Sequence, residues 1–237
     1  MPGEEATGQG GSFWQPARGC GAFSGVMTPR KLFVAGSSGA TGRQVVSLAT
    51  EQGLEVLAHL RPKPGRHADA HTAVFELSDS QALLAALRGC TTVLQLIGTT
   101  RQRFAAGDTY ESSDIATTQA LVEVGQKAGV DHFVLLSAVG AGYPLGAYLR
   151  AKADAERLVR GSALPWTIFR PSAFITESQK APRGFAALTR ALGLRRFEPI
   201  PLPLLARGLV RSGKERAPLG TILEGSALFA FVSPASG

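Results

Sequence analysis

Three side chains in the middle of the chain are of types that together can protonate a substrate oxygen. Ser137 ends the apolar run HFVLLS, and Tyr148 and Lys152 follow eleven and fifteen residues later. Helix residues four apart lie on the same face, one turn from each other. A nearby ammonium makes a phenol a better proton donor, because it favours the ionised form left after transfer. We interpret Tyr148 as a candidate general acid, Lys152 as the group that tunes it, and Ser137 as a hydrogen-bond partner for a carbonyl oxygen.

The same three residues also have an interpretation without chemistry. Tyr148 can pack on its own helix, Lys152 can pair with Glu156 one turn further on, and Ser137 can simply end a strand. The residues alone leave both interpretations open.

A glycine-rich turn near the start of the regular pattern can hold a phosphate. In KLFVAGSSGATGRQVV (residues 31–46), an apolar run leads into Gly36, Gly39 and Gly42, and an amphipathic pattern follows. This order predicts a strand, a tight turn and a helix. Backbone N–H groups without side chains around them, at the positive end of a helix, favour a pyrophosphate. The turn therefore predicts a dinucleotide site.

The end of the next predicted strand indicates which dinucleotide binds. An acidic residue at that position holds the ribose hydroxyls of NAD, whereas here LEVLAHL is followed by Arg61, Pro62 and Lys63. A guanidinium can pair in a bidentate manner with the extra phosphate of NADP. We therefore predict that NADP(H) is preferred over NAD(H) and that Arg61 binds it. The alternative is that Arg61 only ends a strand in solvent.

The elements that must position these residues alternate along the chain. Strands alternating with helices indicate right-handed βαβ units, a parallel sheet and a doubly wound α/β fold of the Rossmann type. We expect strands at residues 31–35, 54–60, 73–75, 92–97, 132–137 and 167–169. We expect helices at residues 42–52, 80–87, 111–128 and 149–160, and a short one near 205–211.

The two ends of the chain depart from this alternation. Residues 1–27 are rich in Gly, Pro and Ala and have no periodicity, which is typical of a disordered leader. We interpret residues 28–237 as a single dinucleotide-binding domain. From about residue 172 the sequence becomes rich in Pro and Arg. Ligands of doubly wound sheets bind beyond the carboxyl ends of the strands, so we expect this segment to cap the substrate side.

Composition and charge narrow the function classes. The net charge is +7, and residues 183–216 hold eight basic and two acidic side chains, so an acidic protein partner is one interpretation and a solvated surface the other. No nucleic-acid module accompanies the charge. Two cysteines and four histidines without a ligand spacing predict no metal site. The chain has no apolar run long enough for a membrane span and no signal peptide, so we expect a cytoplasmic protein.

Five motifs resemble the atypical branch of the short-chain dehydrogenase/reductase superfamily. They are VAGSSGATGR (34–43), QLIGTTR (95–101), LLSAVGA (135–141), AYLRAKADAE (147–156) and WTIFRPSAF (166–174). Within that branch the chain is most similar to the Tat-interacting-protein oxidoreductase-like and NmrA-like proteins. The similarity covers about residues 30–228.

The resemblance implies a Rossmann fold that binds NADP(H), with Ser137, Tyr148 and Lys152 as the catalytic serine, tyrosine and lysine. It also implies that Lys152 reaches the nicotinamide ribose. The other positions that it assigns to the cofactor are Gly36, Ser38, Gly39, Ala40, Thr41, Gly42, Gly98, Thr99, Arg170 and Pro171. Where many relatives carry an Asp that contacts the adenine, this chain has Phe75-Glu76-Leu77.

Two functions follow as hypotheses. The first is an NADP(H)-dependent oxidoreductase that reduces a small carbonyl substrate, and the presence of all three catalytic residue types favours it. The second is a dinucleotide-binding sensor or scaffold whose bound NADP(H) changes its affinity for a protein partner. The short C-terminal region and the basic segment favour this second hypothesis.

Overall fold

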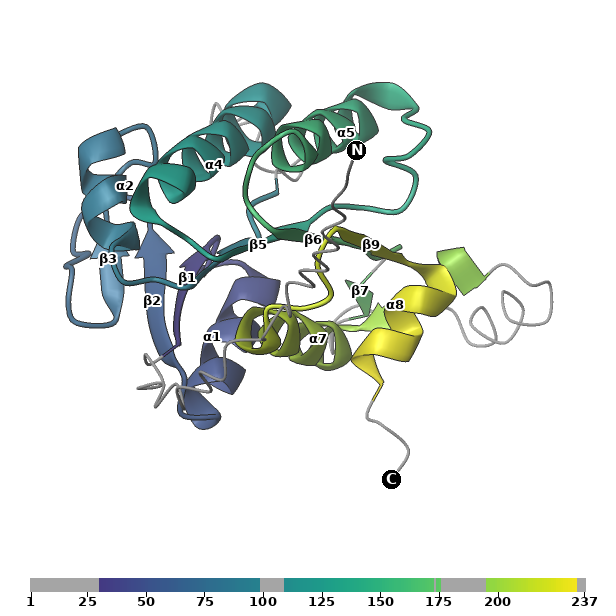
Figure 1. Cartoon of the computed structure of the whole chain (residues 1–237), viewed down its shortest axis with the longest axis horizontal. Coiled ribbons are helices and arrows are strands. Elements are labelled where there is room, and N and C mark those ends of the chain that lie inside the picture. The colour runs from purple at the N-terminus through teal and green to yellow at the C-terminus, as the bar shows by residue number, and fades with distance from the viewer. Residues whose placement is uncertain (1–29, 99–108, 173, 176–194, 234–237) are drawn as a thin grey trace, which may run out of the picture.

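The protein has three layers, with a parallel sheet between two layers of helices (Figure 1). The computed structural model describes residues 30–98, 109–172, 174–175 and 195–233. The leader proposed for residues 1–27 lies outside these ranges.

The central sheet confirms the predicted doubly wound α/β class. It has seven strands in the order β3-β2-β1-β4-β5-β6-β9, and every neighbouring pair is parallel. The strand order reverses direction between β1 and β4, which is where such sheets bind ligands. The strands are β1 (Lys31–Ala35), β2 (Glu55–Leu60), β3 (Thr72–Val74), β4 (Thr92–Gln95), β5 (His132–Leu136), β6 (Trp166–Arg170) and β9 (Thr221–Glu224).

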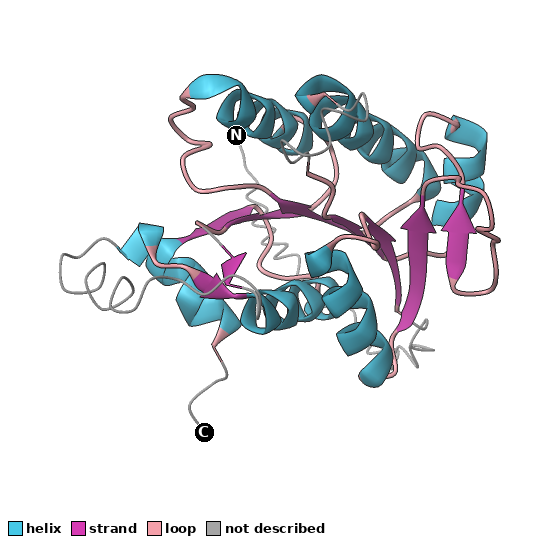
Figure 2. Ribbon diagram, turned by 180° about the vertical axis from the view of Figure 1, so that it is seen from behind, coloured by secondary structure: helices cyan, strands magenta, loops and turns pink. Residues whose placement is uncertain are grey.

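Helices cover both faces of this sheet, as the view from behind also shows (Figure 2). One face carries α1 (Ala40–Glu51), α7 (Leu202–Glu215) and α8 (Gly225–Val232). The other face carries α2 (Ser80–Leu87), α4 (Ala116–Ala128) and α5 (Gly146–Arg160), and a π-helical turn, η1 (Glu111–Ile115), leads into α4.

The core is divided between these two faces because alternate residues of a strand point to opposite sides. Leu32 and Val34 of β1 belong to the cluster beneath α1 and α7, whereas Phe33 and Ala35 belong to the cluster beneath α2, α4 and α5. All four are fully buried. Burial on both faces explains why β1 is a continuous apolar run after Lys31.

The C-terminal part of the chain contributes to this core to a greater extent than its sequence suggested. Helix α7 is longer than the short helix expected near residues 205–211, and it buries Leu205, Leu209 and Val210 against the sheet. Thr92 Oγ1 of β4 donates a hydrogen bond of 3.0 Å to the carbonyl of Gly213. Strand β9 and helix α8 were not predicted. Residues 202–232 are therefore part of the domain's layers.

A small two-stranded sheet lies between β6 and α7 in the chain. It pairs β7 (Phe174–Ile175) with β8 (Ile200–Pro201), and a short 3-10 helix, η2 (Arg195–Phe197), precedes β8. Only residues 172–201 could therefore form the predicted cap on the substrate side. Residues 173 and 176–194 lie outside the described residues, so this cap stays a prediction.

Candidate cofactor and active site

A cleft of about 620 Å³ lies at the carboxyl edge of the sheet. Its walls come from the turn after β1, the ends of β2 and β4, and the residues around the start of α4. Of the residues predicted to bind the cofactor, five line it: Gly36, Ser38, Gly39, Arg61 and Gly98.

The glycine turn after β1 is required by close backbone contacts. Gly36 has φ +88°, a conformation that favours glycine, and a Cβ there would lie 2.9 Å from the backbone nitrogen of Ile97. A Cβ on Gly42 would lie only 2.1 Å from the carbonyl oxygen of Gly36. Gly39 donates its N–H to that same oxygen at 3.1 Å and forms the N-cap of α1. The turn thus exposes a helix N-terminus without a side-chain cap, which suits a pyrophosphate.

The remaining predicted residues of the turn, Ala40, Thr41 and Gly42, do not line the cleft. Ala40 begins α1, and Thr41 and Gly42 are buried in its first turn. These residues form the start of α1, whereas Ser38 and Gly39 line the cleft.

A buried polar chain ties the ends of the first three strands together, and sequence reasoning missed it. Ser37 Oγ donates to the carbonyl of His59 at 2.6 Å, and His59 Nε2 lies 2.9 Å from the carbonyl oxygen of Phe75. Burial lowers the pKa of His59, so its ring is neutral near pH 7 and can donate to Phe75. His59 also lines the cleft.

The far end of the cleft is cationic. Arg61, Lys63 and Arg66 all line it, and Arg66 Nη1 donates to the carbonyl of Arg61 at 2.8 Å. Glu76, from the stretch where relatives carry the adenine-binding Asp, lines the same region. With three cationic side chains and one carboxylate, this end of the cleft has a net positive charge, which favours the binding of a phosphate.

Gly98 connects the cleft to the candidate catalytic residues. A Cβ on Gly98 would lie 3.4 Å from Lys152 Nζ. Its predicted partner in cofactor binding, Thr99, lies outside the described residues.

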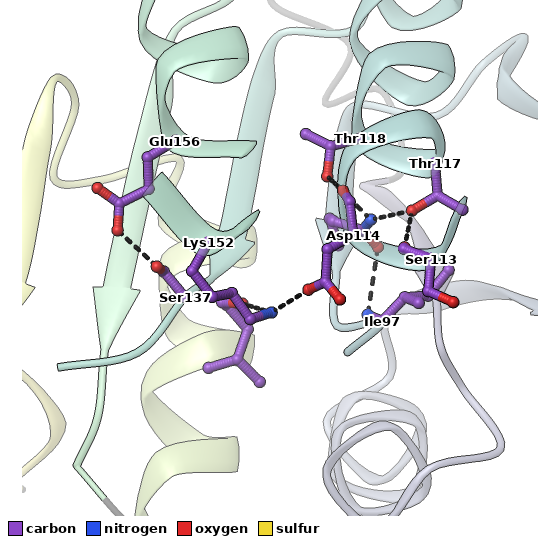
Figure 3. A network of polar contacts seen from close by, with 10 residues as sticks. Ile97, Ser113, Asp114, Thr117, Thr118, Ser137, Lys152 and Glu156 are labelled. Atoms are coloured by element: carbon purple, nitrogen blue, oxygen red, sulfur yellow. Dashed lines mark hydrogen bonds and ion pairs between the residues drawn. The ribbon is translucent and has the colours of Figure 1, made fainter. Parts of the chain in front are cut away.

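Lys152 forms a buried ion pair with Asp114, a residue that sequence reasoning did not single out. Lys152 Nζ lies 2.7 Å from Asp114 Oδ1, and the two side chains are 5% and 1% exposed (Figure 3). The same ammonium donates to the carbonyl of Leu136 at 3.3 Å. The structure therefore gives Lys152 a different partner from Glu156, the one that the interpretation without chemistry supposed.

Tyr148 lies beside this ion pair, as the spacing of four residues predicts. Lys152 Nζ is 6.0 Å from the centre of the Tyr148 ring. The centres of the Tyr110 and Tyr148 rings are 5.7 Å apart. Tyr148 is 38% exposed, and its partial burial raises its pKa, the Lys152 ammonium lowers it, and Asp114 and Tyr110 raise it again. The Lys152 ammonium acts on the pKa of Tyr148 in the expected direction, but the net direction is upward. Burial outweighs the single ammonium, and a carboxylate opposes it.

Ser137 makes its side-chain hydrogen bond with Glu156. Ser137 Oγ donates to Glu156 Oε1 at 2.5 Å (Figure 3). Glu156 is buried and is held in turn by Arg170, whose Nε donates to Oε1 at 2.8 Å and whose Nη2 donates to Oε2 at 2.5 Å. Arg170 also donates to Glu224 at 3.1 Å. These carboxylates raise the pKa of Arg170 further.

The backbone around Arg170 and Pro171 lies close to Ser137. The N–H of Ser137 donates to the carbonyl of Phe169 at 2.8 Å, and that of Val139 donates to Pro171 at 2.9 Å. The turn after β6 therefore lies beside the end of β5. The Arg170 guanidinium, however, serves Glu156 and Glu224, so a contact between it and a cofactor stays a prediction.

The described residues contain no group of three His, Cys, Asp or Glu side chains that could hold a metal ion. None of the helices that these residues form has both the length and the apolar character needed to cross a membrane.

Comparison with known families supports the dinucleotide site. A family described as NAD(P)H-binding matches residues 36–196, more than half of the chain. The match includes the glycine turn, Arg61 and the Ser137, Tyr148 and Lys152 positions.

Two curated relatives each match about three fifths of this chain. The mitochondrial protein FMP52 of Debaryomyces hansenii is 27% identical over 157 residues, which cover 63% of this chain and 69% of the relative. The photosystem II assembly factor Ycf39 of Trieres chinensis is 31% identical over 150 residues, 60% of this chain and 46% of the relative. This chain thus matches less than half of the length of Ycf39.

Solved structures confirm the fold. A short-chain dehydrogenase/reductase superfamily protein from Agrobacterium tumefaciens, with bound NAD, superimposes with a TM-score of 0.64 and 23% identity, covering 83% of this chain and 77% of that one. The UDP-N-acetylglucosamine 4-epimerase from Bacillus cereus has a TM-score of 0.60 and 16% identity, with coverage of 83% and 79%. The chain therefore has structural neighbours in the short-chain dehydrogenase/reductase superfamily, and what it shares with them at this identity is the fold.

Proposed function

Since the chain belongs to the NAD(P)H-binding family, we propose that it is an NADP(H)-dependent oxidoreductase that reduces a small carbonyl substrate. The observation that carries this proposal is the position of Gly98. This residue lines the dinucleotide cleft, and Lys152 Nζ lies 3.4 Å from where its Cβ would be. A proton-donating pair, Tyr148 and Lys152, therefore lies next to the end of the cofactor cleft.

The chain's own residues account for the proton in this reaction. When bound, NADPH supplies the two electrons and the hydrogen that a carbonyl carbon accepts. Tyr148 gives its phenolic proton to the carbonyl oxygen, which becomes the hydroxyl of an alcohol. The phenolate left on Tyr148 is stabilised by the Lys152 ammonium 6.0 Å from its ring centre, and it recovers its proton from water.

Ser137 has to change partner to take part. Its hydroxyl hydrogen is donated to Glu156 at 2.5 Å, so it orients a carbonyl oxygen by donation only after rotating away from that carboxylate. Without rotation, its oxygen still accepts hydrogen bonds from a substrate.

The cationic end of the cleft supports a preference for NADP(H) over NAD(H). Arg61, Lys63 and Arg66 line the cleft at the end of β2, where the ribose of a dinucleotide bound in a Rossmann fold lies. A guanidinium can hold the extra phosphate with two parallel hydrogen bonds, and that phosphate is absent from NAD(H).

A side-by-side fluorescence titration of the protein with NADPH and NADH tests the cofactor assignment. We expect NADPH to bind at least about tenfold more tightly, because a hydrogen bond to a charged group contributes about 1.5–3 kcal/mol. Equal affinities would remove the preference, and binding of neither would reduce the glycine turn to a structural role. Oxidation of bound NADPH by a panel of small aldehydes and ketones then tests turnover.

The runner-up is a sensor or scaffold whose bound NADP(H) changes its affinity for an acidic protein partner. Two observations favour it: Ser137 is tied to Glu156, and Lys152 is tied to Asp114. One relative is also named as an assembly factor. Against it, described arginines of the basic segment are paired within the chain: Arg196 with Glu224, Arg211 with Glu215, and Arg216 with Asp131. Cofactor binding without oxidation by any carbonyl of the panel would favour this alternative.

The cytoplasmic location also stays a proposal, since one relative is named as mitochondrial. Fractionation of cells that express the full chain with a C-terminal tag tests it, and recovery of the tag with mitochondria would overturn it.

A further inference from the structure

Asp114 and Lys152 bring opposite charges together beside the proposed general acid. Their ion pair spans two elements, η1 and α5, with 2.7 Å between Oδ1 and Nζ. Both side chains are almost completely buried. Water screens such a pair weakly, so the fields of both charges reach neighbouring groups.

The π-helical turn explains why Asp114 reaches Lys152. A π turn inserts an extra residue into a helix and changes the direction in which the following side chains point. Here Asp114 is buried within η1, and its carbonyl accepts a hydrogen bond of 2.6 Å from Thr118 Oγ1. Gln95 of β4 donates to Thr117 at 3.0 Å and to Thr118 at 3.3 Å. The turn is thereby anchored to the sheet (Figure 3).

Besides its partial burial, three groups around Tyr148 affect how easily it loses its proton. Lys152 lies on its own helix, and Tyr110 and Asp114 come from the segment that packs across from it. The Lys152 ammonium favours the phenolate, whereas the Asp114 carboxylate beside that ammonium disfavours it. Because the two charges are only 2.7 Å apart, their effects on Tyr148 oppose each other.

We propose that Asp114 is a positioning residue that holds Lys152 and offsets part of its charge, so that Tyr148 forms less phenolate than it would beside an unpaired ammonium. Its significance for catalysis rests on the proposed function, because Tyr148 is the general acid of that reaction and Lys152 stabilises the phenolate that the reaction leaves. The raised pKa of Tyr148 agrees with this role.

An ultraviolet titration of tyrosine ionisation tests the proposal without cofactor or turnover. The chain has three tyrosines, and subtracting the titration of Tyr148→Phe from that of the wild type isolates the Tyr148 signal. Each Asp114 variant is compared with its own Tyr148→Phe counterpart. In Asp114→Asn we expect roughly three- to tenfold more Tyr148 phenolate at a fixed pH below the midpoint, because the ammonium then acts unopposed.

Two variants separate charge from shape. Asp114→Glu keeps the carboxylate, so its titration should stay close to that of the wild type. Asp154→Asn removes a carboxylate from α5 that pairs with the exposed Arg157, and it should leave the Tyr148 signal unchanged. An unchanged or smaller phenolate fraction in Asp114→Asn would overturn the proposal.

A double variant keeps the test decisive if Asp114→Asn does not fold. Asp114→Asn combined with Lys152→Met removes both charges, which buried pairs often tolerate better than the loss of one partner. If the two charges cancel, Tyr148 in this double variant titrates close to the wild type, whereas Lys152→Met alone forms less phenolate. A double variant that matches Lys152→Met would overturn the proposal. A failure of carbonyl reduction would leave these titrations unaffected, so the two proposals can fail separately.

Discussion

Ser137 and Glu156 share a hydrogen bond of 2.5 Å in the interior, with the serine as donor. Arg170 holds the same carboxylate with two further hydrogen bonds and reaches Glu224 of β9 as well. Arg170 and Glu224 are direct register partners on the neighbouring strands β6 and β9. The candidate catalytic serine is therefore linked, through the buried Glu156 and the partly buried Arg170 and Glu224, to the C-terminal edge strand of the sheet.

Glu156→Gln should destabilise the protein strongly. The substitution removes the charge of the buried Glu156 and leaves the partly buried Arg170 guanidinium with Glu224 as its carboxylate partner. Breaking a buried ion pair costs about 3–5 kcal/mol in unfolding free energy. Urea unfolding followed by circular dichroism measures this loss. Asp154→Asn is the matched control on the same helix, where an exposed pair with Arg157 is worth less than about 1 kcal/mol. Equal losses in the two variants would show that the Glu156 network contributes little.

Tyr148→Phe should reduce carbonyl-dependent NADPH oxidation by about 10²- to 10⁴-fold, the usual contribution of a general acid. Its affinity for NADPH should stay at the wild-type value, because Tyr148 is not among the residues that line the cleft. Steady-state kinetics and a fluorescence titration measure the two quantities. Tyr143→Phe is the control, since that ring is 83% exposed. A wild-type rate in Tyr148→Phe would exclude this residue as the acid.

Arg61→Ala should weaken NADPH binding about tenfold or more and leave NADH binding nearly unchanged. The reason is that only NADPH carries the phosphate that a guanidinium at this position would hold. Arg88→Ala removes an exposed arginine that does not line the cleft, and both affinities should remain. If Arg61→Ala weakens both cofactors equally, Arg61 does not recognise the extra phosphate.

The stability of the protein should fall as the pH drops from about 6.5 to about 4, and His132 should contribute to this fall. His132 is fully buried, and burial lowers its pKa from 6.5 to about 4. Between these values the unfolded chain binds a proton that the folded chain does not, so acid favours unfolding. The full shift corresponds to about 3 kcal/mol.

Unfolding free energies of the wild type and His132→Gln at several pH values isolate this contribution. The difference in unfolding free energy between the wild type and His132→Gln should shrink as the pH falls. The wild type loses stability because its unfolded chain binds a proton at His132, whereas the variant has no imidazole at this position. His67→Gln, at an exposed position, should follow the wild type at every pH. A difference that does not change with pH would remove His132 from the acid response.

Local patterns in the sequence were sufficient to predict the first six strands and the helices between them. Apolar runs of four to six residues mark strands that are buried on both faces, and β1 and α2 begin and end at the predicted residues. The glycine turn was predictable because a Cβ on Gly42 would meet Gly36 within the same short segment, whereas the close approach of Gly36 to Ile97 became visible only in the structure. Strand β9 and helix α8 were missed, since runs of four and eight residues are too short to show a clear period.

The sequence by itself determined the fold class, the dinucleotide turn and the pairing of Tyr148 with Lys152, because each depends on residues close together in the chain. Only the tertiary structure decided which carboxylate serves which catalytic group. Asp114 reaches Lys152 from another helix, and Glu156 pairs with Arg170 and accepts a hydrogen bond from Ser137. These pairings join residues far apart in sequence, and a buried charge takes the partner that the packing places within hydrogen-bond distance.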